Sequence, residues 1–307
     1  MTSIPLTDVF TIVYVLVDDW YQQKGKQYLH GKPGVRPEFT DSEVITLMLM
    51  QDFIPYPSET QYIGYLRANY LTLFPKLLSQ GQFNRRARNL RLLVEKLRQH
   101  WIQGKAWQDQ SCFLLDTKPV PVLGYKRNKH QSDFLGSADY GHCASRNLNY
   151  FGYKLVTIST LFGIPIFYDL VPANTDERQA AEAVIDHFVF CDILGDKGFI
   201  GLAWQTQIFD QTGNLIWTPR RANQKVQNSP ALNRFLSSKR ERIEGIFHEV
   251  QDVGRNIERL LAKTILGLAT RVICKMTSHI LRHLLLVDFG VNVQTFEVVS
   301  SSVEFFL

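Results

Sequence analysis

Three acidic side chains stand where carboxylates often do chemistry. Asp116 ends the apolar run "FLLDT", and Asp196 ends the apolar run "DILGD". Ligands of open α/β sheets bind at the carboxyl ends of the strands, so these two acids are expected to lie close together. Glu244 lies beside the apolar face marked by Ile243 and Phe247 in "RERIEGIF". Helical spacing there predicts that Glu244 turns inward toward the same edge.

Three convergent carboxylates cannot all stay ionised without a compensating positive charge. Divalent cations such as Mg²⁺ or Mn²⁺ supply that charge, and Mg²⁺ prefers carboxylate and water oxygens while it also binds phosphates. Two such ions, about 3.5–4 Å apart, catalyse phosphoryl transfer in many sites. The alternative is structural, because an aspartate at a strand end is often only a turn or cap residue. The three acids as a set favour a metal site.

Basic residues gather in segments that suit an anionic partner. One group lies in "QFNRRARNLRLLVEKLRQHW", with a single acid, Glu95, and the others lie in "TPRRANQK" and "SSKRER". A solvated helix face or loop explains each segment equally well. Together they predict phosphate contacts with DNA. The residues are Arg85, Arg86, Arg88, Arg91, Arg220, Arg221, Lys225 and Arg240.

The pattern of apolar residues changes near Trp107. Before it, apolar residues at helical spacing predict helices, one of which begins at Thr40 or Asp41 with Glu43 as a capping partner. After it, "SCFLLDT", "YFGYKLVTIST" and "GIPIFYDLVP" predict strands, while 126–147 read as a polar loop. Helices then alternate with the strands "VFCDILGD" and "GNLIWTP". This order predicts a mixed five-stranded sheet flanked by helices.

Composition narrows the class of protein. The 307 residues hold 34 Lys and Arg against 29 Asp and Glu, and four widely separated cysteines. The cysteines form no C-x-x-C pair, so the sequence indicates neither a zinc site nor a disulfide framework. The apolar stretch 153–171 is broken by Gly163 and Pro165, which predicts two strands and a turn rather than a membrane span. The N-terminus lacks the pattern of a signal peptide, so we expect a soluble intracellular protein.

At these residues the sequence resembles a bacterial insertion-sequence transposase of the DDE superfamily, with a ribonuclease-H-like catalytic domain. Asp116 in "LLDTKPVPV", Asp196 in "ILGDKGF" and Glu244 in "RERIEGIF" match the three acids of that family in order. "FTDSEVITLMLMQDF" is similar to the helical region that precedes the catalytic domain in one branch. The resemblance departs where many relatives have a Tyr and a Lys around the third acid, because Ser237 and Gln251 stand there.

The resemblance implies a function. The three acids would hold Mg²⁺ (or Mn²⁺), water would cut phosphodiesters at the element ends, and the freed 3′-OH would join target DNA. It implies a helical DNA-binding-like region at 1–106, a ribonuclease-H-like DDE domain at 107–286 and a divergent tail at 287–307. Double-stranded DNA is the expected partner of a homodimer in the bacterial cytoplasm, associated with the nucleoid. No membrane and no small-molecule substrate are expected.

Other interpretations stay open at this point. A metal-dependent nuclease on the same fold would use the same acids without strand transfer. A transposase relic that only binds DNA would keep the basic segments. His279 and His283 have the spacing of helical metal ligands, but no acid lies between them, so packed histidines are favoured over a zinc site.

Overall fold

The computed structural model describes residues 4–29, 37–143, 147–224, 227–239 and 256–291. These residues form two compact units. The first unit contains the described residues up to 99 and those from 269 to 291, and the second contains those from 100 to 268. The predicted boundaries at 106 and 286 stay a prediction.

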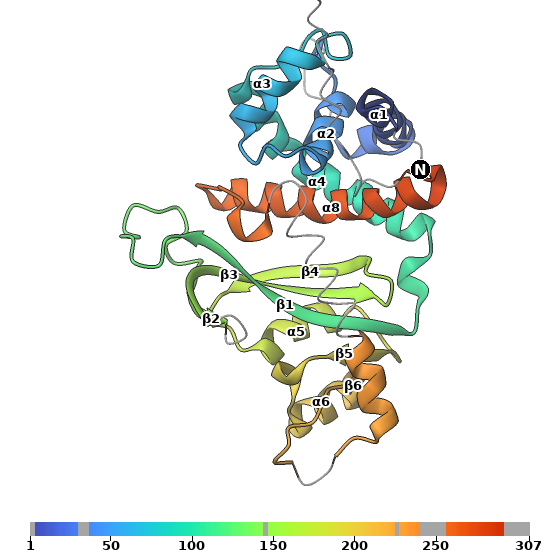
Figure 1. Ribbon diagram of the computed structural model, residues 1–307, viewed down its shortest axis with the longest axis vertical. Coiled ribbons are helices and arrows are strands. Elements are labelled where there is room, and N and C mark those ends of the chain that lie inside the picture. Colours follow the sequence, from blue (N-terminus) through green and yellow to red (C-terminus); the bar gives the residue numbers. More distant parts are fainter. Residues whose placement is uncertain (1–3, 30–36, 144–146, 225–226, 240–255, 292–307) are drawn as a thin grey trace, which may run out of the picture. The chain divides into compact units, whose positions relative to one another are not determined.

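The first unit is built of helices, as the apolar spacing predicts. On α4, the five apolar residues at helical spacing from Leu90 to Trp101 are all buried. The helices are α1 (Leu6–Gln23), α2 (Asp41–Met50), α3 (Glu59–Asn69), α4 (Gln80–Gly104), whose end lies in the second unit, and α8 (Ile265–Phe289), which begins there (Figure 1). The described helices include none that is long and apolar enough to cross a membrane.

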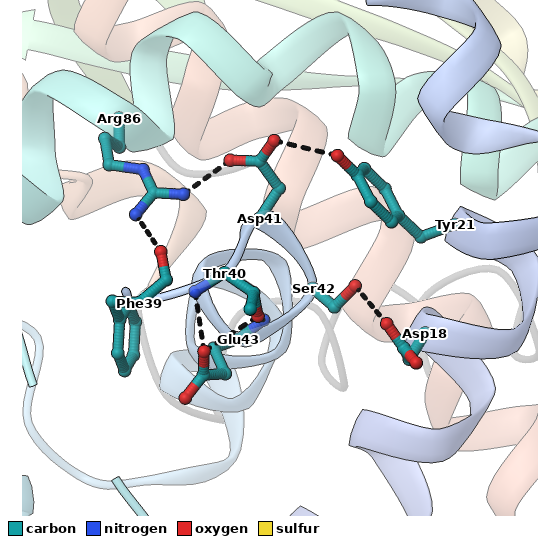
Figure 2. A network of polar contacts seen from close by, with 8 residues as sticks. All are labelled: Asp18, Tyr21, Phe39, Thr40, Asp41, Ser42, Glu43 and Arg86. Carbon is teal, nitrogen blue, oxygen red and sulfur yellow. Dashed lines mark hydrogen bonds and ion pairs between the residues drawn. The ribbon is translucent and has the colours of Figure 1, made fainter. Parts of the chain in front are cut away.

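The predicted start of α2 is confirmed by its capping contacts. The Thr40 hydroxyl accepts a hydrogen bond from the Glu43 backbone N–H at 3.2 Å, and the Glu43 carboxylate accepts from the Thr40 backbone N–H at 2.6 Å. Figure 2 shows this reciprocal pair at the first turn of α2. Both backbone donors would otherwise lack partners at the helix end, so the two side chains fix where the helix begins.

Two buried ion pairs join α8 to other parts of the first unit. Lys275 Nζ lies 3.9 Å from Asp52 Oδ1, with side chains only 4% and 3% exposed. Arg271 Nη2 lies 3.3 Å from Glu59 Oε1. Such pairs cost desolvation energy, but removing one partner leaves a buried charge uncompensated. The pairs therefore link residues far apart in the sequence.

The second unit contains a six-stranded mixed sheet. β3 pairs antiparallel with β1, β2 and β4, whereas β1–β5 and β5–β6 are parallel pairs. The mixed α/β class is therefore confirmed. The strands are β1 (Cys112–Leu123), β2 (Asp139–Cys143), β3 (Leu148–Thr160), β4 (Pro165–Pro172), β5 (Asp192–Gly195) and β6 (Leu215–Trp217).

The described part of the sheet has one strand more than the five expected, because β2 falls in the segment expected to be loop. β2 pairs with the first five residues of β3. Its residues alternate between half-buried and exposed, and none is fully buried. A short polar strand with one partner carries no apolar alternation, so the sequence pattern gives no signal for it.

β1 runs on through Pro119 and Pro121, and its backbone directions explain why. The Ser111 carbonyl accepts from the Asp192 N–H at 2.8 Å, so odd-numbered residues of β1 direct their backbone polar groups toward the β5 side. The two prolines are odd-numbered, and the register with β5 stops at Leu115. Their missing N–H groups are therefore not needed by β3.

The opposite edge of β1 approaches β3 very closely. A Cβ atom added to Gly152 of β3 would lie 2.2 Å from the Val120 carbonyl oxygen, so only glycine fits at this position. β1 is thus held along one edge by β3 over its whole length and along the other edge by β5 only at its start.

Helices pack on the sheet of the second unit. Figure 1 shows α5 (Glu177–Ile185) against β3 and β4, and α6 (Leu202–Thr212) beside β6. The Phe113 ring of β1 packs on Phe188, which follows α5, at a centroid distance of 4.5 Å. The helical residues 230–239 place Leu236 against Leu114 of β1 and Leu194 of β5.

The buried pair Asp52–Lys275 gives a stability prediction. Lys275→Met should lower the free energy of unfolding by about 3 kcal/mol, because the Asp52 carboxylate stays buried and loses the charge of Lys275. The double variant Asp52→Leu/Lys275→Met should recover most of that loss. Urea denaturation followed by circular dichroism measures both, with the exposed Lys96→Met as control. Equal losses in the single and double variants would contradict this reasoning.

Candidate active site

The two predicted aspartates are brought together by the parallel pairing of β1 and β5. Leu114 pairs with Leu194 and Leu115 pairs with Gly195. Asp116 and Asp196 are the next residues along the two strands. Residues two apart in a strand project to one face, so Asp116 shares the face of Leu114. The site therefore begins where the register of two neighbouring strands ends.

Each carboxylate also makes a local backbone contact. The Asp116 Oδ1 accepts a hydrogen bond from the Thr117 N–H at 2.7 Å. The Asp196 Oδ1 accepts from the Gly198 N–H at 2.7 Å and caps the short helix Lys197–Phe199. Asp196 is therefore a helix-cap residue, which is the structural role that an aspartate at a strand end often has. These bonds also fix the directions of the carboxylates.

The charges of this site act on one another. Burial, and after it the nearby charge of Asp196, raises the pKa of Asp116 from 3.8 to about 7. Glu177 adds to this effect, while the Thr117 N–H and the charge of Lys118 act against it. The carboxyl group of Asp116 is therefore both shielded from water and close to other negative charges.

Glu177 is the acid that sequence reasoning missed. It is the first residue of α5, and its Oε1 accepts a hydrogen bond from Thr117 Oγ1 at 3.4 Å. Burial first, and then the charge of Asp196, raises the pKa of Glu177. In the sequence "NTDERQ", an acid in the first turn of a helix is explained by the helix dipole alone, so nothing there indicates a neighbour of Asp116.

A lysine accompanies the acids on β1. Lys118 lies two residues after Asp116, hence on the same face, and its Nζ lies 3.7 Å from Glu258 Oε1. Both side chains are largely buried, at 10% and 14% exposure. Glu258 belongs to the short helix Ile257–Arg259, which packs on β1. Lys118 therefore pairs with Glu258, and its positive charge also acts to lower the pKa of Asp116.

The third predicted acid, Glu244, lies outside the described residues, as do Lys225 and Arg240. The helical residues just before it are described. Leu232 and Leu236, one helical turn apart, pack with Leu114 and Leu194. These two leucines of the sheet share the face of Asp116 and Asp196. The helix that leads toward Glu244 in the sequence is thus seated on that same face.

The donor set fits a hard divalent cation. Asp116 and Asp196 offer carboxylate oxygens, which are the ligands that Mg²⁺ prefers, and the predicted third ligand lies outside the described residues. Within the described part of the chain, no three His, Cys, Asp or Glu side chains are arranged closely enough to hold a metal ion by themselves. His279 and His283 approach each other at 3.3 Å between their Nε2 atoms on α8, and no metal cluster includes them there either.

The predicted DNA-binding arginines of α4 differ in their surroundings. Arg85 is exposed, whereas Arg86, Arg88 and Arg91 are half-buried. Figure 2 shows the Arg86 guanidinium between the Phe39 carbonyl oxygen and the Asp41 carboxylate, with both of which it bonds. Asp41 in turn accepts a hydrogen bond from the Tyr21 hydroxyl at 3.0 Å. Arg86 thus stabilises the start of α2, whereas the Arg85 side chain is exposed to solvent.

The basic loop after β6 is also divided. Arg221 is exposed, whereas Arg220 is half-buried and donates through Nε to Asn228 Oδ1 at 3.3 Å. Asn228 also donates to the Thr218 carbonyl at 3.0 Å, so Arg220 belongs to a contact that shapes the loop. Of the described predicted arginines, Arg85 and Arg221 are the exposed pair.

Comparisons with known proteins were made on sequence and on structure. A search of curated protein sequences gave no significant match. Two similar solved structures are a pre-cleavage Mos1 transpososome and a Mos1 transposase paired-end complex with the left transposon end. The first is 14% identical, covers 76% of this chain and 83% of that chain, and has a TM-score of 0.23. The second is 14% identical, covers 78% and 88%, and has a TM-score of 0.21.

TM-scores this low carry no argument about this chain. The sequence profile of the family described as "Transposase DDE domain" matches residues 107–281, which is more than half of the 307 residues. The match includes both strand-end aspartates and the segment with Glu244. On that ground, the chain belongs to the transposase DDE domain family.

Proposed function

We propose that this chain is a DNA transposase whose Asp116, Asp196 and Glu244 cut phosphodiesters at the ends of a DNA element and join the freed 3′-OH to target DNA. The observation that carries the proposal is the position of Asp116 and Asp196 directly after two paired strands, where burial and the charge of Asp196 raise the pKa of Asp116. Family membership supports the choice of chemistry.

The acids would act by holding Mg²⁺ or Mn²⁺. When bound, two such ions would activate the attacking oxygen and stabilise the leaving one in an in-line displacement. The chain's own contribution is to aim the carboxylates: the Thr117 N–H fixes Asp116, and the Gly198 N–H fixes Asp196. Lys118, two residues from Asp116, limits the negative charge that builds up before the cation arrives.

The reaction needs no nucleophile from the protein. In the first step a water oxygen attacks the phosphorus at an element end, and the bond to the 3′ oxygen breaks to give a 3′-OH. In the second step that 3′-OH attacks a target phosphodiester and displaces the target's own 3′ oxygen. Positioning of the two DNA strands by the protein supplies the rest of the rate enhancement.

Glu244 is proposed as the third acid because of its spacing from described contacts. Leu232 and Leu236 face the strands that carry Asp116 and Asp196. Residues 240 and 244 follow in the sequence at the same interval of four, which is the interval that keeps helical residues on one face. This spacing supports the assignment of Glu244 over Glu241.

DNA contact is proposed for the basic residues, with Arg85 and Arg221 as the exposed ones among those described. Arg88, Arg91, Arg220, Lys225 and Arg240 complete the proposed set, while Arg86 would support it from within through Asp41. Two element ends must be cut together, so a homodimer on DNA is proposed. The proposed location is the bacterial cytoplasm, in association with the nucleoid.

Cleavage assays test the acid set. Asp116→Asn, Asp196→Asn and Glu244→Gln should each lower Mg²⁺-dependent cutting of a labelled duplex with the element's ends by about a hundredfold or more, because each removes a charged metal ligand. The matched control is Asp192→Asn at the other end of β5, where Asp192 accepts a hydrogen bond from Trp217 Nε1 at 2.7 Å. It should cut normally.

Three outcomes of that assay would change the assignment. Full activity of Glu244→Gln would mean that Glu244 is not the third acid, and the assignment would move to Glu241. Cutting without joined products would identify a nuclease. Binding without any cutting by the unaltered protein would identify a relic that only binds DNA.

The raised pKa of Asp116 predicts how stability without metal depends on pH. A pKa of about 7 in the folded protein, against 3.8 ordinarily, means that the folded state binds this proton more tightly than the unfolded chain does. The stabilisation is complete below about pH 4 and is lost as pH rises to about 7, by on the order of 4 kcal/mol. Asp116→Asn should flatten this part of the profile in EDTA. Matching profiles for both proteins would contradict the assignment.

Arg85 and Arg86 form a matched pair for DNA binding. Arg85→Ala should leave the unfolding free energy unchanged and lower the slope of log affinity against log salt by about 0.9, the value for one phosphate contact. Arg86→Ala should instead cost about 2 kcal/mol of stability, because Asp41 and the Phe39 carbonyl lose their donor. Fluorescence anisotropy and urea denaturation separate the two effects. The reverse pattern would refute the division.

A further inference from the structure

The loop after β1 and the start of β2 carry a second surface with the chemistry of a nucleic-acid contact. Two tyrosines are half exposed: Tyr125 at 45% and Tyr140 at 48%. Their rings meet edge to face, with centroids 5.4 Å apart. Lys126 and Arg127 follow Tyr125 and are exposed. We call Tyr125, Lys126, Arg127 and Tyr140 the tyrosine surface.

A buried lysine, Lys129, holds the tyrosine surface in place. Lys129 is only 9% exposed, and its Nζ lies 5.1 Å from the centroid of the Tyr140 ring and 5.2 Å from that of Phe151. The same Nζ donates to the carbonyl oxygens of Gly124, at 3.3 Å, and Tyr125. The lysine thus fixes both the backbone at Tyr125 and the ring of Tyr140.

The rest of the loop is anchored as well. The Phe134 side chain is fully buried and packs edge to face on Tyr153, and the Arg127 N–H donates to the Gly124 carbonyl at 3.0 Å. Exposed aromatic rings on an anchored loop lose little freedom when a ligand stacks on them. The surface is therefore preorganised for stacking.

The charge of this surface is positive. The ammonium group of Lys129 contacts carbonyl oxygens and aromatic rings, and none of these contacts is with a carboxylate. The two acids of the segment make other contacts: Asp139 accepts from Asn174 Nδ2 at 2.8 Å and from the Tyr140 N–H at 2.7 Å, and Asp133 accepts from the Ile265 N–H at 2.7 Å. An anion near Lys126 and Arg127 would also be attracted by the buried cation.

We propose that the tyrosine surface is a DNA-contact site, in which Tyr125 and Tyr140 stack an unpaired base while Lys126 and Arg127 contact the neighbouring phosphates. Aromatic faces with interleaved cations are the features that bind single-stranded nucleic acid. An acidic peptide would use the cations but would not need the two rings. This inference rests on the proposed action on DNA and adds residues outside the basic segments considered so far.

The position of the surface along β1 fits such a role. β1 carries Asp116 and ends at Leu123, two residues before Tyr125. Seven residues of extended strand span about 23 Å. That length corresponds to roughly seven base pairs of duplex. The unpaired base would thus lie on DNA that flanks the scissile phosphate and not at the cut itself.

Photocrosslinking tests the stacking. Short DNA with a single-stranded end that contains 5-iodouracil is bound in EDTA, irradiated and digested for peptide mapping. We expect the crosslink in the peptides with Tyr125 or Tyr140. Tyr140→Leu should weaken binding of this DNA by about tenfold, and Tyr140→Phe should retain it, because the ring and not the hydroxyl stacks. Phe209→Leu, which alters a similarly exposed ring on α6, should bind as the unaltered protein does.

A second variant does not depend on the aromatic packing. Lys126→Ala/Arg127→Ala should reduce the slope of log affinity against log salt by about 1.4 on single-stranded DNA, the value for two phosphate contacts. An unchanged slope, together with a crosslink that maps elsewhere, would overturn the proposal that the tyrosine surface contacts DNA. If the unaltered protein binds and cuts DNA in that case, the proposed function stands. If it binds no DNA at all, both proposals fall.

Discussion

The parallel pairing of β1 with β5 is the contact on which the candidate site depends. Four residue pairs, from Cys112–Asp192 to Leu115–Gly195, set the register. Because the register ends one residue before each aspartate, two carboxylates that are 80 positions apart in the sequence become neighbours. A shift by one residue would turn Asp116 to the opposite face, toward the side where Phe113 packs on Phe188. The apolar residues of β1 and β5 therefore determine the electrostatics of the site.

The same strands seat the helix that leads toward the third acid. Leu114 and Leu194 precede the two aspartates by two positions, and both pack with Leu236. One face of the sheet thus combines an apolar patch with charged groups at its end. The patch positions the helix, while burial near it raises the pKa of Asp116. Packing and acid–base behaviour have a common origin here, and a substitution at Leu236 would disturb both.

The sequence predicted those parts of the fold that have a strong local pattern. Thr40 and Glu43 have the capping spacing, and Asp116 and Asp196 follow apolar runs, so each was identifiable without neighbours. β2 was missed because an edge strand such as "DYGHC" has no apolar alternation. Glu177 was missed because a helix start explains an acid equally well. Arg86 could not be told from Arg85, since only the fold brings Asp41 to one of two adjacent arginines.

The two prolines of β1 have a consequence for how copies of this protein meet. Beyond Leu115, the side of β1 that faces β5 has no strand partner among the described residues. A bare strand edge is a template on which another chain can add a strand, and such addition leads to aggregation. Pro119 and Pro121 present no N–H along this edge, so a foreign strand finds its ladder interrupted at two successive positions. β1 can therefore extend beyond β5 to the loop that carries Tyr125, while this edge resists unwanted self-assembly.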